Sequence, residues 1–180
     1  MSSYQVAPDF ARFLQKVQNL NLRPIAYQLT QSRSGLQWSP AQAAKAITRY
    51  IAFLYLVDRY PHLQLVPTRE IDEVWHQHIL DTTKYAEDCQ ILFGRFIHHF
   101  PYLGTRGEAD RQALLKAYAI TLVLFRKHFG SQMVNGFDHA DCEPLSLFEG
   151  GAEGAGCAHT QAAQIRPEVA IDLSEIWSES

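Results

Sequence analysis

Residues 38–60 read Trp-Ser-Pro-Ala-Gln-Ala-Ala-Lys-Ala-Ile-Thr-Arg-Tyr-Ile-Ala-Phe-Leu-Tyr-Leu-Val-Asp-Arg-Tyr, and Pro61 follows them. The hydroxyl of Ser39 can accept a hydrogen bond from a backbone N–H of a first helical turn, and Pro40 lacks the donor that this turn would leave unpaired. Pro61 disfavours helical geometry in the residue before it. Apolar residues recur between these signals at spacings of three and four, as on the buried face of a helix. We therefore expect a long core helix from Pro40 to about Arg59.

The segments on either side of this helix show the same apolar spacing. The further helices that we expect span residues 9–20, 22–31, 69–80, 82–96 and 109–129. Thr68 is a suitable N-cap for the third of these segments, and Gly130 is a suitable stop for the last. The Asp-Thr-Thr sequence at 81–83 leaves open whether 69–80 and 82–96 form one helix or two. The predicted fold class is all-α, an irregular helical bundle of about five helices.

Charge divides the 180 residues into a body and a tail. The whole chain is 47% hydrophobic and 19% charged, which is typical of a globular protein. Residues 1–130 carry 15 Lys and Arg against ten Asp and Glu, whereas residues 131–180 carry one Arg against nine acids. We expect residues 1–130 to form one helical domain and 131–180 to form a largely irregular, Gly-containing acidic tail. The residues that could pin this tail to the body are Ile171, Leu173, Ile176 and Trp177, within a short segment at 169–177.

The same composition limits the partners of the protein. The cations of the body are scattered, with no basic run longer than Arg126-Lys127, so a nucleic-acid partner is not expected. The longest apolar run, at 50–57, is far shorter than the roughly 20 residues that span a bilayer, and the first residues do not resemble a signal peptide. The sequence has no P-loop or dinucleotide fingerprint, so a nucleotide cofactor is not expected. We expect a cytoplasmic protein that has no membrane partner and has an unknown protein or small-molecule partner.

Four of the eight histidines lie between positions 76 and 99, together with a thiol and several carboxylates. Imidazole, thiolate and carboxylate groups are the ligands that zinc and iron use in proteins. The candidate metal ligands are His76, His78, Cys89, His98 and His99, and the candidate supporting residues are Asp72, Trp75 and Tyr85. Asp72 lies one helical turn before His76 and could orient its ring. The spacing matches no standard metal motif, and it leaves open a structural role in which these histidines pack in the core or lie on the surface.

A helical wheel separates the candidate ligands. At about 100° per residue, His78 lies on the apolar arc with Trp75 and Cys89, whereas His76 lies about 160° away from it. A regular helix therefore cannot present both histidines of the His-x-His pair to one ion. The adjacent histidines at 98–99 also point to different sides, so at most one of them is expected to join the site.

The motif Asp72-x-x-Trp75-His76-x-His78 is the specific part of a longer pattern. The pattern includes Tyr50-Ile-Ala-Phe-Leu-Tyr-Leu, Val66-Pro-Thr, the motif itself, Tyr85-x-x-Asp88-Cys89, Phe93-Gly94 and His98-His99-x-Pro101. Over roughly residues 38–130 it resembles the glycine-rich domain-containing protein-like family, which occurs in plants and bacteria. This resemblance implies a shared site around the motif, and it supplies no catalytic residue.

Three functions are compatible with these observations. The first is a helical protein that binds a transition metal, zinc or iron, or another ligand through the His/Asp/Cys cluster. The second is a metal-dependent enzyme for hydrolytic or oxygen chemistry, in which the ion keeps an open coordination position and Tyr85 or a free histidine acts as acid or base. The third is a metal-free protein-interaction domain that its acidic tail regulates. Whether the protein is an enzyme stays open at this point.

Overall fold

The computed structural model describes residues 8–31, 37–137 and 166–171. These ranges contain six helices and no strand, so the predicted all-α class is confirmed. The helices are α1 (Pro8–Val17), α2 (Arg23–Thr30), α3 (Pro40–Arg59), α4 (Arg69–Leu80), α5 (Thr82–Phe93) and α6 (Glu108–Val134). Within the described ranges, none of these helices has the length and apolar character needed to cross a membrane.

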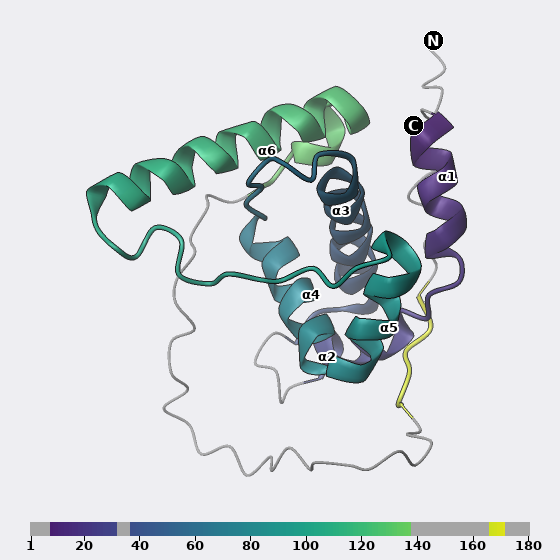
Figure 1. The fold of residues 1–180 in the computed structure, drawn as a ribbon. Coiled ribbons are helices and arrows are strands. Elements are labelled where there is room, and N and C mark those ends of the chain that lie inside the picture. Colours follow the sequence, from purple (N-terminus) through teal and green to yellow (C-terminus); the bar gives the residue numbers. More distant parts are fainter. Residues whose placement is uncertain (1–7, 32–36, 138–165, 172–180) are drawn as a thin grey trace, which may run out of the picture.

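Helix α3 lies at the centre of the bundle, where it contacts α1, α2, α4 and α6 (Figure 1). The predicted start is confirmed, because the Ser39 hydroxyl accepts from the Gln42 backbone N–H at 3.2 Å and the Gln42 side chain accepts from the Ser39 N–H at 2.8 Å. This reciprocal pair satisfies two of the donors that a helix start leaves open. The helix ends at Arg59, as predicted, one residue before the Tyr60-Pro61 pair. Most of its residues from Ala43 to Leu56 are buried, which suits a helix surrounded by others.

The chain between α4 and α5 breaks at Asp81. Helix α4 starts where it was predicted, with the Thr68 hydroxyl accepting from the Ile71 N–H at 3.3 Å. At Asp81 the backbone leaves helical geometry, with φ −86° and ψ 73°, and the carboxylate accepts from the Lys84 N–H at 3.3 Å. Asp81 therefore caps a new helix, and the question left open by the sequence is settled in favour of two helices.

Helix α5 ends three residues earlier than predicted, at Phe93 rather than Phe96. Gly94 adopts a left-handed conformation (φ 65°), which terminates the helix at low cost because glycine has no Cβ. The connector that follows, residues 94–107, runs back across the bundle to the outer end of α6 (Figure 1). The early stop of α5 thus frees the stretch that contains the second histidine pair.

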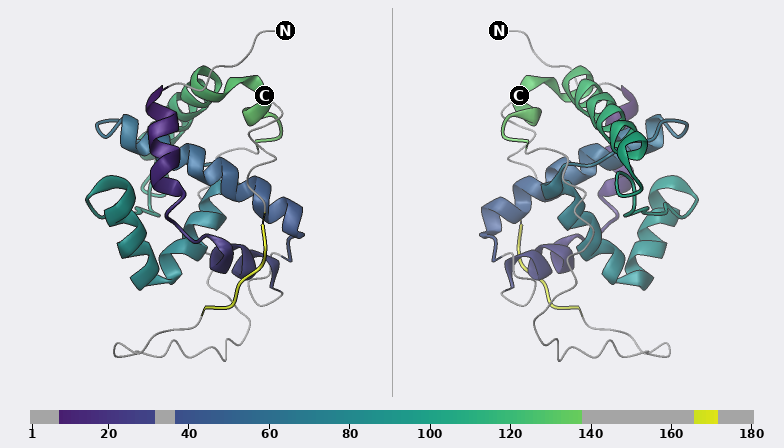
Figure 2. Two further views of the ribbon diagram at one scale, coloured as in Figure 1. Left: turned by 90° about the vertical axis from the view of Figure 1, so that its right-hand side faces the viewer. Right: turned by 90° about the vertical axis from the view of Figure 1, so that its left-hand side faces the viewer.

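Helix α6 extends beyond the rest of the body at its N-terminal end (Figure 1), and in the side views of Figure 2 it lies at the end of the bundle opposite α2. It bends at Gly130 (φ 77°, ψ 174°), and helical residues continue to Val134. Gly130 was predicted as the stop of this helix, and the regular helix is indeed interrupted there, although a short helical segment follows it. The C-terminal segment 166–171 returns to the body, where Arg166 pairs with Asp81 at 3.0 Å.

Part of the predicted tail contact is seen in this returning segment. Ile171 packs against the core, together with Val169. The other residues that we expected to pin the tail, Leu173, Ile176 and Trp177, lie outside the described residues, as do Cys142 and Cys157.

Candidate metal centre

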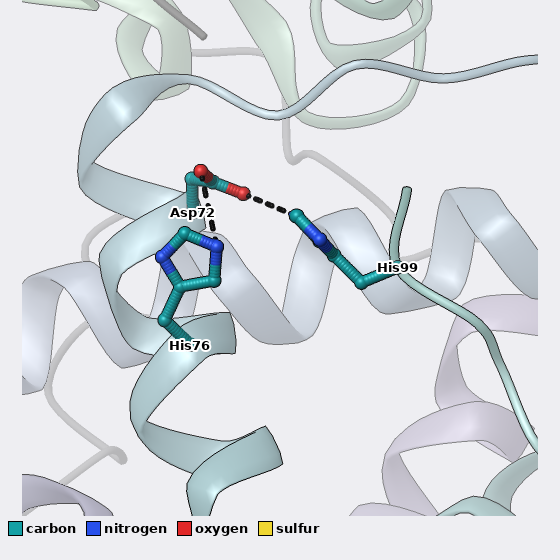
Figure 3. Close-up of side chains that lie close together, drawn as sticks. All are labelled: Asp72, His76 and His99. Atoms are coloured by element: carbon teal, nitrogen blue, oxygen red, sulfur yellow. Dashed lines mark hydrogen bonds and ion pairs between the residues drawn. The ribbon is translucent and has the colours of Figure 1, made fainter. Parts of the chain in front are cut away.

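Helix α4 and the connector bring two imidazoles and one carboxylate together. Asp72 and His76 lie one turn apart on α4, and His99 faces them from the connector (Figure 3). The His99 Nε2 atom donates to Asp72 Oδ1 at 2.9 Å, and His76 Nε2 lies 3.6 Å from Asp72 Oδ2. Within the described residues these three form the group in which one ligand atom from each side chain lies within 4.8 Å of the others. Ligand atoms around one ion at about 2.1 Å are separated by roughly 3–4 Å, so the present spacing is slightly wider than that of ligands around a bound ion.

The Nε2 atom of His76 lacks a hydrogen-bond partner although it is buried. Its distance of 3.6 Å from the Asp72 carboxylate is too long for a hydrogen bond. A buried polar atom without a partner costs free energy, and most such atoms in folded proteins are satisfied by protein groups, water or ions. This nitrogen is therefore an open position of the group.

The surroundings of the three side chains combine an aromatic wall with partial access to solvent. The ring of Trp75 packs edge-on against His99, with centroids 4.7 Å apart and an interplanar angle of 85°. The side chains of Asp72, His76 and His99 are 20%, 23% and 15% exposed. The group is thus neither sealed in the core nor free on the surface, which suits a site that exchanges small ligands.

His78, a predicted ligand, lies in a separate buried network. Its Nδ1 is 2.9 Å from the Tyr50 hydroxyl, and its Nε2 is 2.9 Å from Asp88 Oδ2. Because a carboxylate only accepts hydrogen bonds, Nε2 carries the ring proton and Nδ1 accepts from Tyr50. The same Asp88 oxygen accepts from Lys84 Nζ at 2.7 Å. Burial lowers the pKa of His78, which keeps the ring neutral, and both of its nitrogens are occupied.

Cys89 and Tyr85 also lie outside the group of three. The Cys89 side chain is buried, and burial raises the pKa of its thiol, which disfavours the thiolate that binds metals. The Tyr85 hydroxyl accepts from Trp75 Nε1 at 2.9 Å and donates to the Ile97 carbonyl at 2.6 Å. Burial also raises the pKa of Tyr85 well above its usual range. Neither side chain is placed to act on a group bound beside His99.

The adjacent histidines of the connector point to different sides, as the sequence predicts. His99 turns inward to Asp72, whereas His98 is exposed and packs against the exposed ring of Phe96 at 4.9 Å. The structure thus places one member of the pair in the group and the other at the surface.

Three members of the buried network were not among the predicted site residues, namely Tyr50, Lys84 and Asp88. Lys84 and Asp88 carry a weak signal, because opposite charges four residues apart on a helix often pair. Tyr50 carries none, since its contact with His78 joins residues 28 positions apart in different helices. Asp72 was predicted only as a supporting residue, whereas its carboxylate lies beside both imidazoles of the group.

Comparison with known proteins adds the family. Residues 14–123 match a family model described as UCP032817-like. The chain belongs to this family. The region that matches contains all three residues of the candidate metal centre.

Two curated relatives come from Arabidopsis thaliana. Glycine-rich domain-containing protein 1 is 28% identical over 113 residues, which cover 61% of this chain and 13% of the relative. Glycine-rich domain-containing protein 2 is 39% identical over 59 residues, which cover 31% of this chain and 8% of the relative. The resemblance expected from the sequence motif is therefore confirmed, and the chain spans a small part of the length of either relative. No solved structure matches the chain.

Proposed function

We propose that this helical domain binds one divalent transition-metal ion, zinc or iron, through Asp72, His76 and His99. The observation that carries the proposal is the buried, unpartnered Nε2 of His76, which lies beside the carboxylate and the imidazole of the other two residues. Two imidazoles and one carboxylate form a donor set that suits both metals.

The arrangement of the ligands along the chain also supports a metal. Asp72 and His76 come from one turn of a helix, and His99 comes from a connector with no regular secondary structure. An ion held by all three would tie the connector to α4. The side-chain hydrogen bond from His99 to Asp72 already links the connector to α4.

A catalytic role is the second candidate, and the number of ligands favours it. Structural zinc sites usually have four protein ligands, whereas catalytic sites have three and keep a position for water or substrate. The partial exposure of the three side chains leaves such a position accessible to a small molecule. Metal-assisted hydrolysis and oxygen chemistry are the reaction classes that fit this donor set.

Metal content and zinc titration of protein purified without a histidine tag test the proposal. We expect one equivalent of zinc in the wild-type protein and in His98→Ala, and strongly weakened binding in His76→Ala and His99→Ala. His98→Ala is a matched control, because it removes the neighbouring imidazole from the same connector. Equal zinc binding by the wild type and His99→Ala, or no binding by the wild type, would contradict the proposal.

A further inference from the structure

We infer that Tyr85 positions the metal ligand His99 by holding the backbone carbonyl of Ile97, a role that rests on the proposed metal centre. Tyr85 belongs to α5 and contributes no atom to the group of Asp72, His76 and His99. Its effect would reach the ion through the connector.

The hydroxyl of Tyr85 makes one hydrogen bond to α4 and one to the connector. It accepts from Trp75 Nε1 at 2.9 Å and donates its one proton to the Ile97 carbonyl oxygen at 2.6 Å. The Tyr85 side chain is 2% exposed, so water does not compete easily for either bond. A hydrogen bond that is shielded from water is stronger than an exposed one, so this bond holds the Ile97 carbonyl in place.

Ile97 is the point at which the connector is held before it reaches His99. Its side chain packs in the core with 6% exposure, its carbonyl accepts from Tyr85, and its backbone N–H interacts with the Cys89 thiol. His99 follows two residues later, and alternate residues of an extended chain point to the same side. Fixing Ile97 inward therefore also directs His99 inward, toward Asp72.

Trp75 connects Tyr85 to α4 and also contacts His99. It lies on α4 between the two ligands Asp72 and His76, and its indole N–H holds the Tyr85 hydroxyl while its ring packs against the imidazole of His99. The Tyr85 hydroxyl thus joins three elements: the helix that carries two ligands, the next helix, and the connector that carries the third. Metal sites in proteins commonly contain such residues, which orient the ligands by hydrogen bonds without touching the ion.

The test compares Tyr85→Phe with Tyr50→Phe. Each variant removes one hydroxyl from a buried tyrosine that contacts a histidine network, but the Tyr50 hydroxyl bonds to His78 and not to the connector. We expect Tyr85→Phe to weaken zinc binding by about 10- to 100-fold, and Tyr50→Phe to leave it unchanged. Measurements in sucrose, which favours the folded state, keep both variants folded.

A second readout does not need the metal. In the metal-free protein, the ¹⁵N signals of the histidine rings report hydrogen bonding, and loss of a signal in His99→Asn assigns that ring. Tyr85→Phe should shift the ring signals of His99, whereas Tyr50→Phe should shift those of His78 and leave His99 unchanged. Unchanged His99 signals and unchanged zinc affinity in folded Tyr85→Phe would overturn the inference. If the wild type binds no zinc but the His99 signals move, the metal proposal fails and the positioning role stands.

Discussion

His76 and His78 lie two residues apart on α4, yet they belong to groups of opposite character. Both nitrogens of His78 are hydrogen-bonded, to Tyr50 and Asp88, and its side chain is 2% exposed. His76 is 23% exposed, and its buried Nε2 lacks a hydrogen bond. The comparison shows that completeness of hydrogen bonding, rather than closeness in sequence, separates the histidine of the buried network from the one that we propose as a metal ligand.

The largest effect is expected from removing the acid of the buried network. Asp88→Ala leaves Lys84 and the His78 ring proton without their acceptor in the core. Breaking a buried charge pair on one side costs about 3–5 kcal/mol, so we expect a loss of this size in the free energy of unfolding, measured with urea. Asp72→Ala is the control in the other group, where a partly exposed acid should cost about 1 kcal/mol or less. Equal losses would erase the distinction between the two groups.

Zinc should stabilise the protein only by binding to the group of Asp72, His76 and His99. At a free zinc concentration 100 times the dissociation constant, binding to the folded state adds about 2.7 kcal/mol to the free energy of unfolding. We expect this gain in the wild type and none in His76→Ala, measured by urea unfolding with and without zinc. A chelator should reverse the gain. An equal gain in His76→Ala would show that the ion binds elsewhere.

Low pH should decrease the free energy of unfolding, because the ring of His78 is buried. Burial lowers the pKa of His78 in the folded state below its unfolded value, so above pH 6.5 the ring is neutral in both states and costs nothing. Below about pH 6.5 the unfolded state binds the proton first, and stability falls by up to about 1.4 kcal/mol per pH unit. His78→Gln should show a shallower slope in urea unfolding between pH 6.5 and 5. Some slope should remain, because burial also lowers the pKa of His128. Parallel slopes in both proteins would assign the acid sensitivity to other groups.

The smallest effect is expected at a third charge pair, which lies at the junction of α4 and α5. Arg166 and Asp81 form a partly exposed pair, and Arg166 lowers the pKa of the Asp81 carboxyl. Arg166→Ala should cost no more than about 1 kcal/mol, and 1 M salt should remove most of the difference from the wild type. The buried pair of Lys84 and Asp88 should resist the same salt. A salt-independent loss in Arg166→Ala would mean that packing, and not charge, holds the segment 166–171.

Much of the fold can be predicted from local signals in the sequence. Ser39 and Thr68 mark the starts of α3 and α4 because a capping side chain acts within its own turn. The end of α5 was predicted three residues too late. A glycine does not by its presence alone end a helix, and the stop is marked by the left-handed conformation of Gly94. The wheel also separates His76 from His78, and the structure has them in different groups.

The composition of the candidate site is less predictable, because it depends on contacts between distant segments. We infer that the choice between His98 and His99 depends on where Ile97 is held, and Ile97 is hydrogen-bonded to Tyr85 on another helix. The Nδ1 atom of His78 is hydrogen-bonded to Tyr50, which lies 28 residues away in the sequence. Neither contact leaves a periodic pattern in the sequence.

Side chains of the connector point alternately inward and outward, and this alternation restricts how the length of the connector can change. Phe96 and Phe100 are 46% and 54% exposed, while Ile97 is 6% exposed and His99 turns toward α4. Surface connectors usually tolerate insertions and deletions. Here the insertion of one residue before Phe96 would exchange the inward and outward sets, as in a strand that slips by one position. His98 would then face Asp72 in place of His99, so an imidazole would be retained, but the anchor at Ile97 would be replaced by an aromatic ring.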